Sequence, residues 1–154
     1  MIHIYYGYGK GKTSSAIGAG MRAKGAGKSV FFAQFLKDNK SSELTVLPFD
    51  IFEAPESVAF NPDASYKEWT DAAIDAAKNS PCDFIILDEF LDVIPNFVSI
   101  AEAIDLLKNT DKEIIITGHK EIKELFELAD YLTFMDKIKH PYDKGVKARK
   151  GIEY

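Results

Sequence analysis

The sequence predicts an α/β fold in which helices cover both faces of a mainly parallel central sheet. Two observations lead to this prediction. Residues 84–87 (FIIL) and 113–116 (EIII) are almost uninterrupted apolar runs, as expected for strands that are buried on both faces. Segments with helical spacing of apolar residues separate the strand-like runs, which is the order of βαβ units.

The first half of the chain begins with a strand and a glycine-rich turn. Residues 2–6 (IHIYY) are β-branched and aromatic and predict the first strand, and the alanine-rich residues 14–24 predict a helix that ends at the GAG of residues 25–27. Beyond it we expect the following elements: a strand at 29–35, a polar loop at 37–43, and short strands at 44–47 and 49–53.

The second half continues the alternation. Residues 54–65 contain two prolines and predict an irregular loop, and the spacing of Trp69 with four alanines predicts a helix at 66–79, with Trp69 in the core rather than in a cofactor wall. The remaining expected elements are a strand at 83–87, a helix at 97–108, a strand at 113–117, a helix at 121–129 and a strand at 131–135. Residues 136–154 are rich in lysine and have no strong period.

Composition limits the class of protein. The chain has 154 residues, 46% of them hydrophobic, and a net charge of −5, which predicts a single domain over residues 1–154 and argues against a protein that coats nucleic acid. The single cysteine, Cys82, excludes an intrachain disulfide. No apolar run approaches the roughly 20 residues that cross a bilayer, and no signal peptide precedes the first strand, so a cytoplasmic location is expected.

The segment after the first strand ends in Gly11-Lys12-Thr13, the tail of a Walker A phosphate loop. Small glycines let the backbone curl so that several N–H groups point at phosphate oxygens, and the positive end of the following helix adds to the attraction. Lys12 would neutralise phosphate charge, and the Thr13 hydroxyl would hold Mg²⁺. This arrangement predicts a three-layer P-loop NTPase-like (RecA-like) fold.

One position departs from the common motif, because Tyr6 stands where the first glycine is usual. The alternative is a glycine-rich turn that opens a helix and carries solvated lysines. A strand, three glycines in five residues, GKT and a helix in succession favour the phosphate loop.

Asp88-Glu89 follows the apolar run at residues 84–87. A carboxylate at the carboxyl end of a neighbouring parallel strand can reach a metal from the side opposite Thr13. The alternative is a pair of acidic residues that begins a solvent-exposed turn; together with the phosphate loop, the functional interpretation is favoured.

Over nearly its whole length the chain resembles the P-loop family of ATP:cob(I)alamin (corrinoid) adenosyltransferases. The loop GYGKGKTS is similar to that family's G-N-G-K-G-K-T-T, and members of the family also lack the first Walker A glycine. Further matching segments are Arg22, Gln34-Phe35-Leu36-Lys37, Leu87-Asp88-Glu89, Thr117-Gly118, Leu128-Ala129-Asp130, and the tail KHPYDKGVKA at 139–148 with KGIEY at 150–154. The tail is the most specific of these matches.

The resemblance implies a transfer in which Co(I) of a corrinoid, cob(I)alamin or cob(I)yrinic acid a,c-diamide, attacks the 5′ carbon of ATP and triphosphate leaves. It implies Mg²⁺ (or Mn²⁺) as cofactor, Thr13 and Glu89 as metal ligands, and Arg22 as a support for the phosphates. Lys12, Glu89 and Arg22 would carry catalysis, and Gln34 and Phe60 would lie on the corrinoid side. The nucleotide would be bound by Gly7, Tyr8, Gly9, Lys10, Gly11, Lys12, Thr13 and Ser14, with the triphosphate reversed relative to ordinary P-loop hydrolases.

Three departures from the family concern the corrinoid side and the phosphates. The chain starts at its first strand, without the family's N-terminal extension, and it has Phe60-Asn61-Pro62 where the family has a Phe-x-Trp pair. Thr117-Gly118-His119 replaces Thr-Gly-Arg, and Tyr8 replaces the loop asparagine. For His119, an ordinary residue at a helix start and a ligand contact are equally open interpretations.

Two other functions remain open at this point. One is a nucleotide-binding carrier or sensor that has lost transfer chemistry, and the other is a P-loop ATPase or kinase. The resemblance also implies a homodimer and a flavodoxin-type reductant as partners. The sequence leaves open the preferred corrinoid, the source of Co(I) and the oligomeric state.

Overall fold

The computed structural model describes residues 1–38, 41–58 and 64–153. Its centre is a six-stranded sheet in the order β3-β2-β4-β5-β1-β6, in which every neighbouring pair is parallel. The strands are β1 (Ile2–Tyr6), β2 (Val30–Gln34), β3 (Asp50–Phe52), β4 (Phe84–Asp88), β5 (Glu113–Gly118) and β6 (Tyr131–Phe134). The predicted parallel sheet is therefore confirmed.

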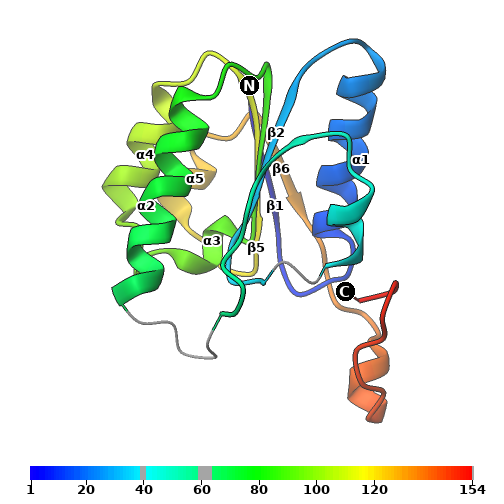
Figure 1. Cartoon of the computed structure of the whole chain (residues 1–154). Coiled ribbons are helices and arrows are strands. Elements are labelled where there is room, and N and C mark those ends of the chain that lie inside the picture. Colours follow the sequence, from blue (N-terminus) through cyan, green and yellow to red (C-terminus); the bar gives the residue numbers. More distant parts are fainter. Residues whose placement is uncertain (39–40, 59–63, 154) are drawn as a thin grey trace.

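Helices cover the two faces of the sheet unequally (Figure 1). One face carries α1 (Lys12–Gly25), and the other carries α2 (Ala64–Asn79), α3 (Phe90–Val93), α4 (Ile100–Lys108) and α5 (Lys123–Phe126). This is the expected three-layer α/β architecture. Among the described residues, no helix is both long enough and apolar enough to cross a membrane.

The two faces of the central strands are buried in two separate clusters. Phe32, Ile86 and Ile115 pack with Ala16 of α1 on one face. Ile85 and its neighbours on β4 and β5 pack against the helices of the other face. Because both faces are covered, apolar residues occupy successive positions along β4 and β5, which explains the runs visible in the sequence.

The prediction of a strand at residues 44–47 is wrong. Ser42–Thr45 forms a short 3₁₀ helix, in which the Leu44 N–H donates to the Ser41 carbonyl and the Val46 N–H donates to the Glu43 carbonyl. The backbone N–H groups of this segment are thus satisfied locally. The side of β2 that faces away from β4 pairs with β3 instead. Val46 is consequently 77% exposed.

Other differences concern where helices begin and end. The helix expected at 97–108 begins at Ile100, because Ser99 caps it and exchanges hydrogen bonds with Glu102 in a capping box. The helix expected at 121–129 is the single turn α5. The short helix α3 was not expected, and neither was the 3₁₀ turn Pro141–Lys144 in the tail.

Trp69 is partly buried and packs against the core cluster, as predicted. Its ring packs against Phe35, Phe52 and Tyr66, with ring centroids 5.4–5.7 Å apart. Its indole N–H donates to the Glu53 carbonyl at 2.9 Å. The polar atom is thereby satisfied while the ring fills the space between α2 and the sheet.

Candidate functional site

The glycine loop lies between the carboxyl end of β1 and the first turn of α1. Gly7 and Gly11 have φ values of +110° and +122°, which residues with a side chain rarely adopt. Gly9 is required for a different reason: its N–H donates to the Met135 carbonyl at 2.7 Å, and a Cβ there would lie 2.6 Å from the Asp136 carbonyl oxygen. The chain leaving β6 therefore presses directly on the loop.

Lys12 is buried inside this loop rather than extended into solvent. Its Nζ donates to the carbonyls of Gly7 at 2.8 Å and Gly9 at 3.3 Å. The ammonium charge is thus held beside the backbone amides at the start of α1. The ammonium group and the N-terminus of α1 both favour an anion in front of the loop, because a helix N-terminus also attracts negative charge.

A cavity of about 570 Å³ opens in front of the loop. Residues 9–14 form one wall, Glu89 lies in another, and Gly151, Ile152 and Glu153 of the tail close a third. The tail is held there by Lys10, whose Nζ donates to the Ile152 carbonyl at 2.7 Å. This volume falls within the roughly 300–1,000 Å³ of small-molecule sites.

Asp88 is the polar centre of the site. The side chain is fully buried and accepts hydrogen bonds from three side chains: Thr13 Oγ1 at 3.1 Å, Gln34 Nε2 at 2.9 Å and Thr117 Oγ1 at 2.7 Å. Because β2, β4 and β5 are adjacent and parallel, residues at or near their carboxyl ends bring these groups together. The carboxylate that accepts a hydrogen bond from Thr13 is therefore that of Asp88, while Glu89 lines the same cavity as Thr13.

Thr13 and Asp88 form a donor set suited to Mg²⁺. A hydroxyl and a carboxylate are oxygen ligands, which this small hard cation prefers, and it commonly retains water and substrate phosphate as its other ligands. Glu89 lines the same cavity and offers a second carboxylate. The residues present thus fit the cation.

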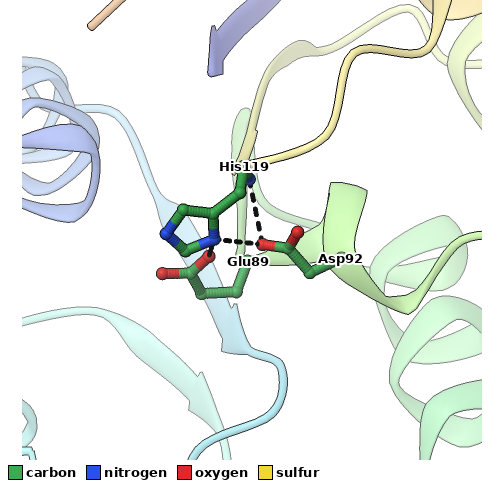
Figure 2. A group of neighbouring side chains, drawn as sticks. All are labelled: Glu89, Asp92 and His119. Atoms are coloured by element: carbon green, nitrogen blue, oxygen red, sulfur yellow. Dashed lines mark hydrogen bonds and ion pairs between the residues drawn. The ribbon is translucent and has the colours of Figure 1, made fainter. Parts of the chain in front are cut away.

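Glu89 belongs to a second cluster, with Asp92 of α3 and His119, which follows β5 (Figure 2). His119 Nδ1 lies 2.8 Å from Asp92 Oδ2 and 3.5 Å from Glu89 Oε2. The His119 backbone N–H also donates to Asp92 Oδ2 at 3.0 Å. Nδ1 therefore faces both carboxylates, while Nε2 points away from them (Figure 2).

The environment of this cluster changes its acid–base behaviour. Burial, together with the nearby Asp92 and Asp88 carboxyls, raises the pKa of Glu89 to about 7, although His119 partly opposes this. The hydrogen bond to Asp92 raises the pKa of His119 above its ordinary value. Glu89 also has a left-handed backbone conformation, with φ of 59°, in the sharp turn between β4 and α3. Such a conformation is uncommon for a residue with a side chain.

The other predicted site residues differ in their distance from the loop and from Asp88. Arg22 is exposed in the last turn of α1, ten residues beyond Lys12 and so about 15 Å along the helix axis. The Gln34 side chain is buried and turned to Asp88. Tyr8 is exposed, with its ring 5.2 Å from that of His119. Phe60 lies outside the described residues.

Sequence reasoning missed three features of the site: the central role of Asp88, the hydroxyl of Thr117 and the carboxylate of Asp92. Thr117 accepts a hydrogen bond from the Glu89 N–H at 2.9 Å and so connects β5 to the Asp88-Glu89 turn. Asp92 had a signal in the sequence, because it is the one charged residue in the apolar run 90–94 (FLDVI) and lies three positions after Glu89. A charge so placed needs a partner.

Comparison with known proteins agrees with this geometry. The family model described as ATP:corrinoid adenosyltransferase BtuR/CobO/CobP matches residues 1–154. The corrinoid adenosyltransferase of Escherichia coli K12 is 32% identical, and the corrinoid adenosyltransferase CobA of Salmonella typhimurium is 30% identical, each over all of this chain and 85% of the relative. That of Pseudomonas aeruginosa is 29% identical over all of this chain and 83% of the relative. The chain belongs to the ATP:corrinoid adenosyltransferase family.

Proposed function

We propose that this chain transfers the 5′-deoxyadenosyl group of ATP to the Co(I) centre of a corrinoid and releases triphosphate. Cobalt supplies the electron pair of the new cobalt–carbon bond and becomes Co(III), while the bond from C5′ to oxygen breaks and its electrons leave with the triphosphate. Co(I) is itself a strong nucleophile, so the protein needs no nucleophilic side chain. Its task is to position the two reactants and to stabilise the leaving group.

The observation that carries this proposal is the buried Lys12 in a glycine loop that opens on a cavity of nucleotide size, in a chain of this family. We assign Lys12 and the backbone amides of residues 7–14 to the phosphates. As ATP binds, the Lys12 ammonium would exchange its carbonyl partners Gly7 and Gly9 for phosphate oxygens. The charge that develops on triphosphate is thereby met by groups already in place.

We assign Mg²⁺ (or Mn²⁺) to the cavity between Thr13 and the two carboxylates Asp88 and Glu89. When bound, the cation would offset charge on the triphosphate. Asp88 holds the Thr13 hydroxyl in place through its hydrogen bond, while Gln34 and Thr117 fix the Asp88 carboxylate. Gln34 thus acts as a positioning residue in this scheme, in addition to any contact with the corrinoid.

The finer substrate assignment is cob(I)alamin or cob(I)yrinic acid a,c-diamide. A flavodoxin-type reductant would supply Co(I), and a homodimer would cover the corrinoid face. The resemblance to the family supports these three points, and each has a direct measurement: relative rates with the two corrinoids, transfer with reduced flavodoxin in place of chemical reductant, and the mass of the particle in solution.

The experiment that tests the function is incubation of the protein with Mg·ATP and chemically reduced corrinoid in the dark. We expect light-sensitive adenosylcorrinoid and an equal amount of intact triphosphate, measured by absorbance and ³¹P NMR. ATP binding without adenosylcorrinoid would identify a carrier or sensor instead. Release of ADP and orthophosphate without corrinoid would identify an ATPase. Either result would overturn the proposal.

A further inference from the structure

Figure 2 shows one imidazole nitrogen of His119 close to an oxygen of each of two carboxylates, those of Glu89 and Asp92. One ligand atom from each of Glu89, Asp92 and His119 lies within 4.8 Å of the others. All three side chains are partly buried, and they come from the end of β4, from α3 and from the end of β5. The fold, rather than one flexible loop, sets their spacing.

The two distances from His119 Nδ1 to the carboxylates are close to those between neighbouring ligands of a metal ion. With metal–ligand bonds of about 2.1 Å, neighbouring ligands lie about 3.0 Å apart in an octahedron and about 3.4 Å apart in a tetrahedron. His119 Nδ1 lies 2.8 Å from Asp92 Oδ2 and 3.5 Å from Glu89 Oε2. A cation could therefore replace the Nδ1 proton with only small side-chain movements.

The hydrogen bonds of the cluster leave one oxygen without a donor. Glu89 Oε2 is a buried atom that accepts no hydrogen bond from the described residues. Asp92 Oδ2, in contrast, is oriented by the His119 backbone N–H as well as by the ring. Once Glu89 is ionised, a buried carboxylate oxygen without a donor is costly, and a cation in the cluster would satisfy it.

We propose that Glu89, Asp92 and His119 bind a divalent transition-metal ion such as Zn²⁺ or Co²⁺, at a second position that shares Glu89 with the Thr13–Asp88 position. The imidazole decides the class of metal, because nitrogen ligands suit these ions whereas Mg²⁺ and Ca²⁺ prefer oxygen alone. Three protein ligands leave positions open for water or for a phosphate oxygen, since Glu89 also lines the nucleotide cavity. The proposal does not depend on adenosyl transfer.

The test is titration of the metal-free full-length protein with Co²⁺, in the absence of ATP and corrinoid, followed by visible absorbance and calorimetry. We expect one Co²⁺ per chain, displaced by Zn²⁺ but not by a large excess of Mg²⁺. His119→Ala and Asp92→Asn should each weaken Co²⁺ binding at least about 10-fold. His140→Ala removes a histidine of the tail and should leave the affinity unchanged, and so should Thr13→Val.

Equal Co²⁺ affinity in His119→Ala and the unaltered protein would overturn the proposal, and so would stoichiometric displacement by Mg²⁺. Circular dichroism checks the fold of each variant. Asp92 also accepts a hydrogen bond from the His119 backbone N–H, so Asp92→Asn could fail to fold. In that case the result for His119→Ala alone tests the proposal. Absent Co²⁺ binding with normal adenosyl transfer refutes this inference only, whereas normal Co²⁺ binding without transfer refutes the proposed function only.

Discussion

The hydroxyl of Thr13 donates a hydrogen bond to the buried carboxylate of Asp88, 3.1 Å away, although the two residues are 75 positions apart in the chain. This contact joins the first turn of α1 to the end of β4, which is separated from β1 in the sheet by β5. Asp88 is therefore one of the residues that hold the phosphate loop and α1 against the carboxyl ends of the strands.

Asp88→Asn should weaken Mg·ATP binding at least about 10-fold, or about 1.4 kcal/mol, and leave the weaker binding of metal-free ATP nearly unchanged. The reason is that an amide removes the charge beside Thr13 and can replace only part of the acceptor set. Calorimetry with and without Mg²⁺ measures both affinities. Asp83→Asn is the matched control. Asp83 lies just before the amino end of β4, the end opposite Asp88, and accepts hydrogen bonds from Ser29.

Lys12→Ala and Arg22→Ala should show whether Lys12 alone, or Lys12 together with Arg22, binds the phosphates. Lys12 is buried at the loop, so Lys12→Ala should weaken ATP binding by about 100-fold, because charge-assisted hydrogen bonds to phosphate are lost. Arg22 lies about three helical turns away, so Arg22→Ala should change ATP affinity by less than about 3-fold. Nucleotide titration followed by calorimetry compares them. A large loss in Arg22→Ala would restore the role that the family resemblance implies.

Gly9→Ala should destabilise the protein by about 1–3 kcal/mol and weaken ATP binding, because its Cβ would collide with the backbone carbonyls of Met135 and Asp136. Gly18→Ala is a matched control for stability. Gly18 lies inside α1, and a Cβ there meets nothing within 4 Å, so the alanine should stabilise the helix by about 0.5–1 kcal/mol. Denaturant unfolding measures both changes, and equal effects of the two substitutions would contradict the close approach at residue 9.

Glu89→Gln should stabilise the metal-free protein more at pH 8 than at pH 5. The pKa of Glu89 is raised to about 7 in the fold, chiefly by burial, so the folded chain retains a proton that the unfolded chain releases above its ordinary pKa of 4.5. The stabilising effect of that proton is complete below pH 4.5 and is lost as the pH rises through 7.

The uncharged glutamine avoids this loss. The difference in unfolding free energy between Glu89→Gln and the unaltered protein should therefore grow by on the order of 2 kcal/mol from pH 5 to pH 8. Thermal or urea unfolding at several pH values measures it, with Glu68→Gln, an exposed glutamate of α2, as control. A difference that shrinks as the pH rises would contradict the burial of an ionisable carboxyl at this position. Adenosyl transfer should fall in the same variant, since the proposal assigns Glu89 to the metal.

Local pattern predicted the long elements well because their signals are local. The strand at residues 2–6, the glycine loop and the helix α1 follow one another in sequence, so periodicity and glycine spacing are sufficient to predict them. The short segments were harder. Residues 44–47 have the composition of a strand, yet the sheet edge they would need is occupied by Asp50–Phe52. Helix α3 is a single turn, too short to show a period.

The sequence alone determined the parallel α/β architecture, the phosphate loop and the family, because the signals for each lie in contiguous residues. Tertiary structure alone decided which acid meets Thr13. Asp88 and Glu89 are adjacent in the chain, but successive residues at a strand end point in different directions, so one side chain enters the Thr13–Gln34–Thr117 network and the other turns to Asp92 and His119. That division depends on which strands are neighbours in the sheet, and no spacing along the chain records it.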